Sequence, residues 1–168
     1  MQENYAMLTD DILPVENCDG LVWGYPGYPQ MRMWPDQAKH FIDNASNLTK
    51  VHPALEKRRI PVGTKGLGRF CSSKRLIKCF YLPERRDPSR WGNGIEIEPL
   101  PKSNSIISLI QHSFIPEVVQ GIGLQPRRLK QITEIITNIP VCRLVYPSRI
   151  DCLPEVRNAI LQDISTIK

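Results

Sequence analysis

Fifteen prolines are spread along this chain of 168 residues, and many of them stand where a helix or strand would begin or end. Proline lacks a backbone N–H, so it is tolerated in the first turn of a helix and at the boundaries of strands. Pro35, Pro126 and Pro154 each precede an apolar pattern of helical period. The chain is therefore expected to form short elements separated by turns.

The apolar pattern predicts strands mainly in the first half and helices in the second. Predicted strands cover 4–9, 12–15, 20–24, 76–82, 95–99 and 141–147. A Gly/Pro-rich loop is predicted over 24–36. Helical faces are predicted at Ala38, Phe41 and Ile42, at Ile106, Leu109, Ile110 and Phe114, at Leu129, Ile132, Ile136 and Ile139, and at Val156, Ala159, Ile160 and Ile164. The expected fold is mixed α/β (α+β), with a mixed, hairpin-rich β-sheet first and helices after it, in a single domain over 1–168.

The composition limits the classes of protein to which the chain could belong. Hydrophobic residues make up 41% and charged residues 23%, which is enough to form a globular core. No apolar run is long enough to cross a membrane, and the first residues do not resemble a secretory signal, so a cytoplasmic protein is expected. The net charge of +5 favours acidic partners, but the basic residues are mixed with acids. A small basic nucleic-acid-binding protein is therefore only a weak alternative.

The five cysteines and three histidines give no clear ligand pattern. The cysteines are odd in number, and no two are spaced Cys-x-x-Cys. Buried or half-buried free thiols are the simplest interpretation. The sequence alone thus indicates neither a zinc site nor a disulfide framework.

Asp10 and Asp11 are the candidates for chemistry. A predicted strand ends at this pair, and carboxylates at a strand end can bind Mg²⁺ or accept a proton from an attacking hydroxyl. The simpler alternative is a pair of turn residues. Arg32, in "PGYPQMRMWPD", lies on a stiff loop and could bind phosphate, or could be the solvent-side neighbour of core methionines.

The glycines of residues 62–70, "VGTKGLGRF", match neither the dinucleotide-binding fingerprint nor a phosphate-binding P-loop, and a flexible hairpin is expected there. The basic residues Lys57, Arg58, Arg59 and Lys65 flank it and could reach phosphates or form a solvated face. The dipeptide Gly-Lys does not occur, so these 168 residues contain no complete P-loop motif.

Several blocks in order carry a resemblance. "LTDDILPVE", "GYPGYPQMRMWPD", "IEIEPLPKSNSIISLIQHSF" and "IPVCRLVYPSRIDCLPEVRNAIL" resemble the HPr serine kinase-like family, over about residues 5–161. These are nucleotide-dependent kinases with a fold similar to that of phosphoenolpyruvate carboxykinase. The most specific pieces are the aspartate pair, the block around Arg32 and "HSF" after a helix.

The resemblance implies transfer of a phosphoryl group from ATP, with Mg²⁺, to a serine hydroxyl of a protein or peptide. Asp10 and Asp11 would supply the catalytic base and support Mg²⁺; Asp11 is the metal candidate, and which of the two is the base stays open. Arg32 and the cluster of Lys57, Arg58 and Arg59 would face the phosphates or the protein substrate.

The sequence departs from the family at one essential element. Nine residues precede Asp10, too few for a P-loop, its helix and the next strand. The expectation is therefore a truncated kinase fold, its C-terminal portion, inactive unless a P-loop is supplied from elsewhere, for instance by a partner chain. The alternative is a non-catalytic binding or regulatory module derived from such a kinase. Whether the chain is an enzyme, and what its phosphoacceptor is, stay open.

Overall fold

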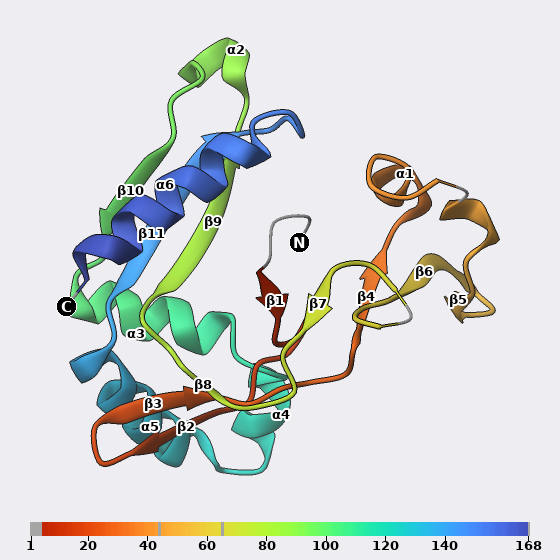
Figure 1. Ribbon diagram of the computed structural model, residues 1–168. Coiled ribbons are helices and arrows are strands. Elements are labelled where there is room, and N and C mark those ends of the chain that lie inside the picture. Colours follow the sequence, from red (N-terminus) through yellow and green to blue (C-terminus); the bar gives the residue numbers. More distant parts are fainter. Residues whose placement is uncertain (1–4, 44, 65, 168) are drawn as a thin grey trace. The chain divides into compact units, whose positions relative to one another are not determined.

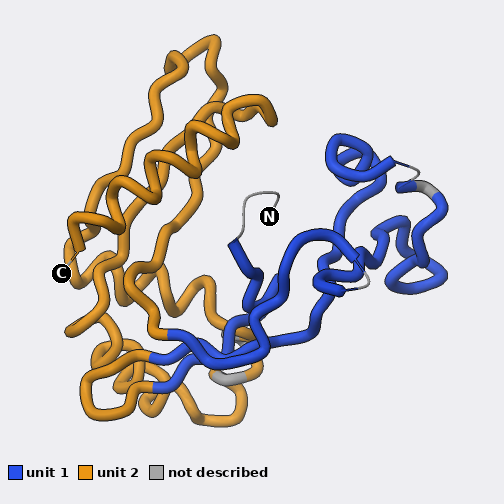
Figure 2. The backbone as a smooth tube through the Cα atoms, in the orientation of Figure 1, with its two compact units in different colours: residues 1–16, 23–75 blue, residues 17–22, 76–168 orange. Residues whose placement is uncertain are grey.

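Helices and strands both contribute to the computed structural model, which describes residues 5–43, 45–64 and 66–167 (Figure 1). This confirms the predicted mixed α/β class. The chain divides into two compact units (Figure 2). Unit 1 comprises residues 1–16 and 23–75, and unit 2 comprises residues 17–22 and 76–168. Each unit has at least one hydrophobic cluster of its own.

Unit 1 contains an antiparallel sheet with the strand order β4-β6-β5, formed by Gln30–Met33, Leu55–Pro61 and Lys50–His52. Met31 lies opposite Ile60, and both are buried. The fully buried Ala38 of the short helix α1 (Pro35–Ala38) belongs to the same cluster. The prediction of a loop over 24–36 was wrong at β4, because the alternation Gln-Met-Arg-Met fits a half-buried strand.

Two shorter pairings complete the β structure of the first half. Strand β1 (Ala6–Met7) runs parallel to β7 (Arg69–Phe70), so the strand before Asp10 is shorter than predicted. The strand predicted over 12–15 lies at β2, Val15–Cys18, instead, and the strand predicted over 20–24 is found as β3, Leu21–Gly24. Both share a sheet with β8, Arg75–Leu76. The two residues between β2 and β3, Asp19 and Gly20, both have positive φ, as a two-residue hairpin turn requires.

Unit 2 is built around β11 (Val141–Pro147), which pairs antiparallel with β10 (Glu96–Pro99) and parallel with β9 (Phe80–Arg86). Most of its side chains are buried on both faces, as expected for a central strand. One face packs on α3 and α5 through Val141, Ile132 and Ile136, and the other on α6 through Leu144 and Val156.

The three long helices begin close to prolines, as the sequence indicated. Helices α3, α5 and α6 cover Lys102–Gln111, Gln125–Asn138 and Leu153–Thr166, near their predicted positions. The short elements α2, α4 and η1 (Pro88–Trp91, Pro116–Gly121 and Ala45–Asn47) were not predicted. The predicted strand 76–82 is divided between β8 and β9. Within the described ranges, no helix combines the length and the apolar character needed to span a membrane.

Candidate functional site

Asp10 and Asp11 meet Arg32, although 22 positions separate Asp10 from Arg32. The backbone N–H of Arg32 donates a hydrogen bond of 2.9 Å to Oδ2 of Asp10. Its side-chain Nη1 lies 3.0 Å from Oδ2 of Asp11. The side chains of Arg32 and Asp11 are 43% and 52% exposed, so solvent screens this ion pair and its contribution to stability is small. Three residues that the sequence singled out thus lie together.

The turn that carries the aspartates is fixed by short-range contacts. Thr9 Oγ1 donates a hydrogen bond of 2.8 Å to the carbonyl of Ile12, which closes the turn around Asp10 and Asp11. Gly27 N–H donates to the Leu8 carbonyl at 2.9 Å. A Cβ on Gly27 would collide with the side chain of Thr9, so glycine allows the two loops to approach.

The neighbouring strand β6 adds cations to the same face of the sheet. Arg59 lies opposite Arg32 in the register, and opposite residues in antiparallel strands project to the same face. Arg59 Nη2 donates to the carbonyl of Val51 at 2.8 Å. Two positions before Arg59, Lys57 shares that face, and its Nζ lies 5.6 Å from the ring centroid of Trp34. Arg32, Arg59 and Lys57, together with Asp10 and Asp11, are called the Asp–Arg face below.

Arg58 projects to the opposite side of the sheet, toward the core. It lies opposite Met33, and its side chain is only 14% exposed. Its Nη1 donates to the Leu48 carbonyl at 3.2 Å, and its Nη2 lies 3.3 Å from Oε2 of Glu56. The structure therefore does not bring Arg58 to the aspartates and gives it a packing role. Lys65, which the sequence also placed near phosphates, lies outside the described residues.

The carboxylates of Asp10 and Asp11 offer oxygen ligands that suit Mg²⁺. This ion is commonly held by one or two carboxylates, with substrate phosphates and water completing its six positions. Among the described residues, the only group of three or more clustered potential ligands lies elsewhere, so this face supplies two carboxylates at most. The donor set fits an ion held largely by phosphates, with Arg32 beside Asp11.

A second group of thiol and polar side chains, in unit 2, could not be predicted from the sequence. Cys79 Sγ lies 3.7 Å from Cys142 Sγ across 63 positions, and Tyr81 donates a short hydrogen bond to Asp163. Burial, followed by the proximity of Cys142, raises the pKa of Cys79 to about 12. Burial also raises the pKa of Cys142 and of Tyr81. No spacing rule links these residues, because they come from different elements.

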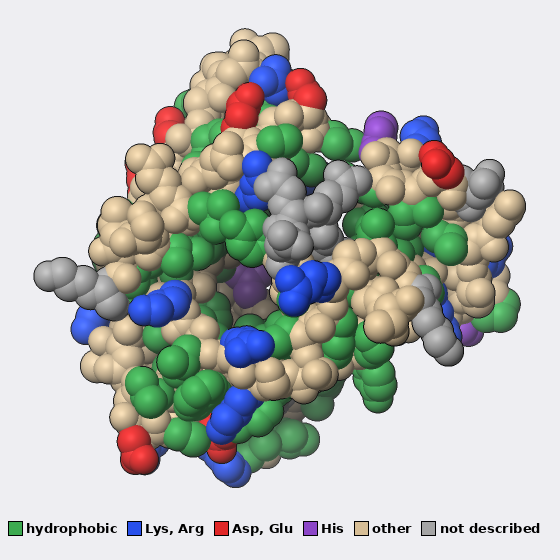
Figure 3. All heavy atoms as spheres, viewed as in Figure 1, with side chains coloured by type: hydrophobic (Ala, Val, Ile, Leu, Met, Phe, Trp, Pro, Cys, Tyr) green, Lys and Arg blue, Asp and Glu red, His purple; other side chains and the backbone are tan. Residues whose placement is uncertain are grey.

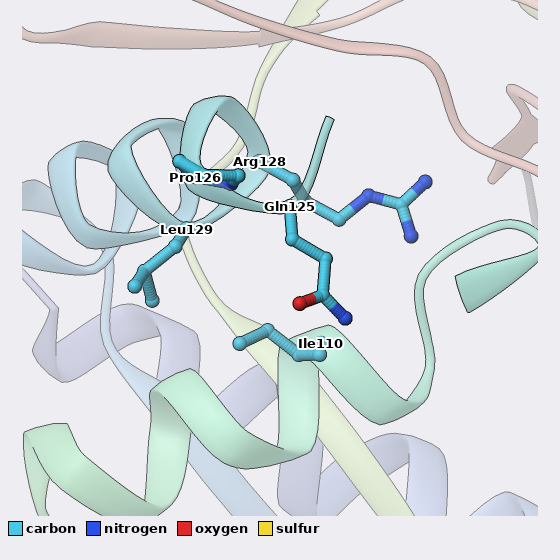
Figure 4. A pocket seen from close by; sticks show the side chains of 5 residues that line it. All are labelled: Ile110, Gln125, Pro126, Arg128 and Leu129. Atoms are coloured by element: carbon cyan, nitrogen blue, oxygen red, sulfur yellow. The ribbon is translucent and has the colours of Figure 1, made fainter. Parts of the chain in front are cut away.

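Unit 2 also carries a pocket between α3 and α5, about 310 Å³ in volume (Figure 4). Ile110, Gln125, Pro126, Arg128 and Leu129 line it. Arg128 is already engaged: its guanidinium donates to Ser113 Oγ at 2.8 Å and to the Phe114 carbonyl at 2.7 Å. The surrounding segment exposes several large apolar side chains, namely Phe114, Ile115, Val118, Ile122 and Leu124.

Lys and Arg side chains are interspersed with hydrophobic and other polar groups on the face shown in Figure 3.

No protein-family model matches the chain, and neither curated proteins nor solved structures give a match.

Proposed function

We propose that the chain contributes the acceptor-activating half of a kinase site, which transfers a phosphoryl group from ATP to a serine hydroxyl of a protein or peptide. The observation that carries this proposal is the convergence of Asp10, Asp11 and Arg32. Two carboxylates and a guanidinium from separate segments meet on one exposed face. The resemblance to HPr serine kinase-like proteins implies roles in catalysis and phosphate binding for the same residues.

Asp10 is the better candidate for the base. Its only hydrogen bond among the described residues comes from a backbone N–H, whereas Asp11 is paired with a full positive charge. A carboxylate placed beside the serine hydroxyl can accept its proton as the oxygen attacks the phosphoryl group. Asp11, through its pairing with Arg32, positions the guanidinium.

The cations of the Asp–Arg face would stabilise the charge on the transferring phosphoryl group. Arginine presents several donors in a rigid fork that matches phosphate oxygens, and Arg32 and Arg59 lie side by side across two strands. Mg²⁺, when bound with ATP, would neutralise further negative charge on the phosphates. The P-loop that cradles the phosphates would come from outside these 168 residues, which contain no such motif.

The test combines this chain with a polypeptide that carries the P-loop, in the presence of Mg-ATP, and detects phosphoserine by mass spectrometry. We expect Asp10→Asn to lower the rate by roughly 10²- to 10⁴-fold, the usual contribution of a general base. Asp36→Asn is the matched control, because Asp36 is exposed in unit 1 and contacts only Lys39 among the described residues. Absence of phosphoserine in every combination, or an Asp10→Asn variant as active as the control, would refute the proposal.

A second function, a non-catalytic binding module, is favoured by the apolar side chains around the pocket in unit 2. Exposed apolar patches of this kind commonly mark sites of protein interaction. Leu129→Glu should abolish partner binding under this second function, whereas Asp10→Asn should leave that binding unchanged. The two functions thus make opposite predictions for Leu129→Glu and Asp10→Asn.

A further inference from the structure

Cys79, Cys142 and Asp163 form a compact group in unit 2, outside the Asp–Arg face. Cys142 lies in β11, Cys79 immediately precedes β9, and Asp163 lies in α6. The two sulfur atoms and a carboxylate oxygen of Asp163 all lie within 4.8 Å of one another. Cys142 is buried and the other two are half-buried, so the group is sheltered but reachable.

The elements fix this group firmly. Cys142 is opposite Tyr81 in the parallel register, and alternation along β9 places Cys79 on the same face of the sheet as Tyr81. Helix α6 covers that face through Val156 and Ile160. The three side chains therefore converge because Cys142 lies in β11, Cys79 directly precedes the adjacent strand β9, and helix α6 packs over the same face.

The sulfur separation matches that of two thiolates on one zinc ion. Zn–S bonds are about 2.3 Å long and the geometry is tetrahedral, so two thiolates on one ion are separated by about 3.8 Å. The observed separation of Cys79 Sγ and Cys142 Sγ is 3.7 Å. An ion that bridges these sulfur atoms would require little rearrangement of either strand.

Tyr81 supplies the outer contact that metal-binding carboxylates usually have. Its hydroxyl donates a hydrogen bond to Oδ2 of Asp163, across 82 positions. Such a contact orients the carboxylate and leaves its other oxygen for an ion. Tyr81 thus has a positioning role and is not a ligand.

We propose that Cys79, Cys142 and Asp163 bind a single zinc ion, with water as the fourth ligand. Two thiolates and one carboxylate are a chemically suitable set for this ion, and three protein ligands with one open position are typical of zinc sites that remain accessible. Binding releases the two thiol protons to solvent. The absence of a Cys-x-x-Cys spacing does not argue against this site, because its ligands come from three separate segments of the chain.

The test uses the chain of 168 residues, reduced and freed of metal with a chelator, and titrated with Co²⁺ as a spectroscopic probe for zinc. We expect one ion per chain, a sulfur-to-cobalt charge-transfer band, and displacement of Co²⁺ by Zn²⁺. Cys79→Ser and Cys142→Ser should each remove most of this band. Tyr81→Phe should weaken affinity roughly 10- to 100-fold while the band remains, as expected for an outer contact.

Cys71→Ser is the matched control, because Cys71 is also buried but contacts Ser73 and Arg75 in unit 1. A charge-transfer band that is absent in the wild-type chain, or that persists in both Cys79→Ser and Cys142→Ser, would overturn the proposal.

If a serine variant fails to fold, alkylation of the wild-type chain tests instead whether Zn²⁺ binds at Cys79. Zn²⁺ should protect Cys79 from iodoacetamide and leave Cys18 as reactive as before. Equal alkylation of Cys79 with and without Zn²⁺ would refute the site.

Discussion

Arg59 lies directly opposite Arg32 in the antiparallel pairing of β4 with β6. Like charges placed directly opposite each other destabilise a sheet. Asp11 offsets the charge of Arg32, and the Val51 carbonyl accepts a hydrogen bond from Arg59. Arg32 and Arg59 together carry more positive charge than Asp11 offsets. The pair is therefore suited to binding an anionic ligand.

Arg59→Gln should therefore change the free energy of unfolding and the affinity for anions in different ways. We expect the free energy of unfolding to stay constant or to rise by up to about 1 kcal/mol, because the cross-strand repulsion is removed. Affinity for inorganic phosphate, measured by calorimetric titration, should fall. Arg127→Gln, an exposed arginine of unit 2, removes the same charge as a control. Loss of stability with unchanged phosphate affinity would assign Arg59 a purely structural role.

Gly66→Ala should destabilise unit 1. A Cβ at this position would overlap the backbone carbonyl of Pro61, which also accepts a hydrogen bond of 2.8 Å from Leu67 N–H. Backbone atoms paired within a sheet cannot move aside easily, so we expect a loss of about 1–3 kcal/mol in urea unfolding. Gly94→Ala is the control, since open space surrounds that position. Equal stability of the two variants would contradict this account of the turn.

Ile115→Gly should stabilise unit 2. Ile115 has φ of 46°, a left-handed conformation that is unfavourable for a β-branched residue, and the residue is 42% exposed. Relief of this strain outweighs the greater chain entropy of glycine, and we expect a net gain of up to about 1 kcal/mol in thermal unfolding. Asp19→Gly, at φ of 52°, should gain less, because aspartate tolerates this region better. A marked loss of stability in Ile115→Gly would show that packing of the isoleucine side chain dominates.

Cys71 should ionise at lower pH than an ordinary thiol. Hydrogen bonding with the Ser73 backbone and then with Arg75 Nε, at 3.1 Å, lowers its pKa. The fraction of thiolate, and with it the alkylation rate, should therefore rise with pH through a midpoint below that of an ordinary thiol. Arg75→Gln should shift this midpoint upward. Site-resolved mass spectrometry measures it, and a midpoint unchanged by Arg75→Gln would contradict the proposed cause.

Elements with a clear apolar period could be predicted from the sequence. The strand 141–147 is found at the predicted residues, and α5 and α6 begin next to the prolines that signalled them. Strand β4 was missed because prolines and glycines surround a four-residue alternation. The helix expected to reach Ile42 ends at Ala38, although Ile42 still packs against the same hydrophobic cluster.

Some residues of the candidate sites could be recognised in the sequence, whereas others could be found only from the structure. Adjacent carboxylates and an arginine between methionines were visible, and the structure brings them together. The inward position of Arg58 depends on the register of β6 against β4, which a run of three basic residues does not specify. The pairing of Cys79 with Cys142 depends on a parallel contact between distant strands, and local patterns carry no information about it.

The parallel pairing of β9 with β11 also sets an order in which the chain can fold during synthesis. Phe80 pairs with Val141, so this sheet cannot close until the intervening helices and β11 itself have left the ribosome. The strands of the β4-β6-β5 sheet lie within residues 30–61 and can associate much earlier. Until residue 147 emerges, the apolar side chains of β9 have no partner strand to pack with. We therefore expect chaperones to bind nascent chains of this protein during that interval.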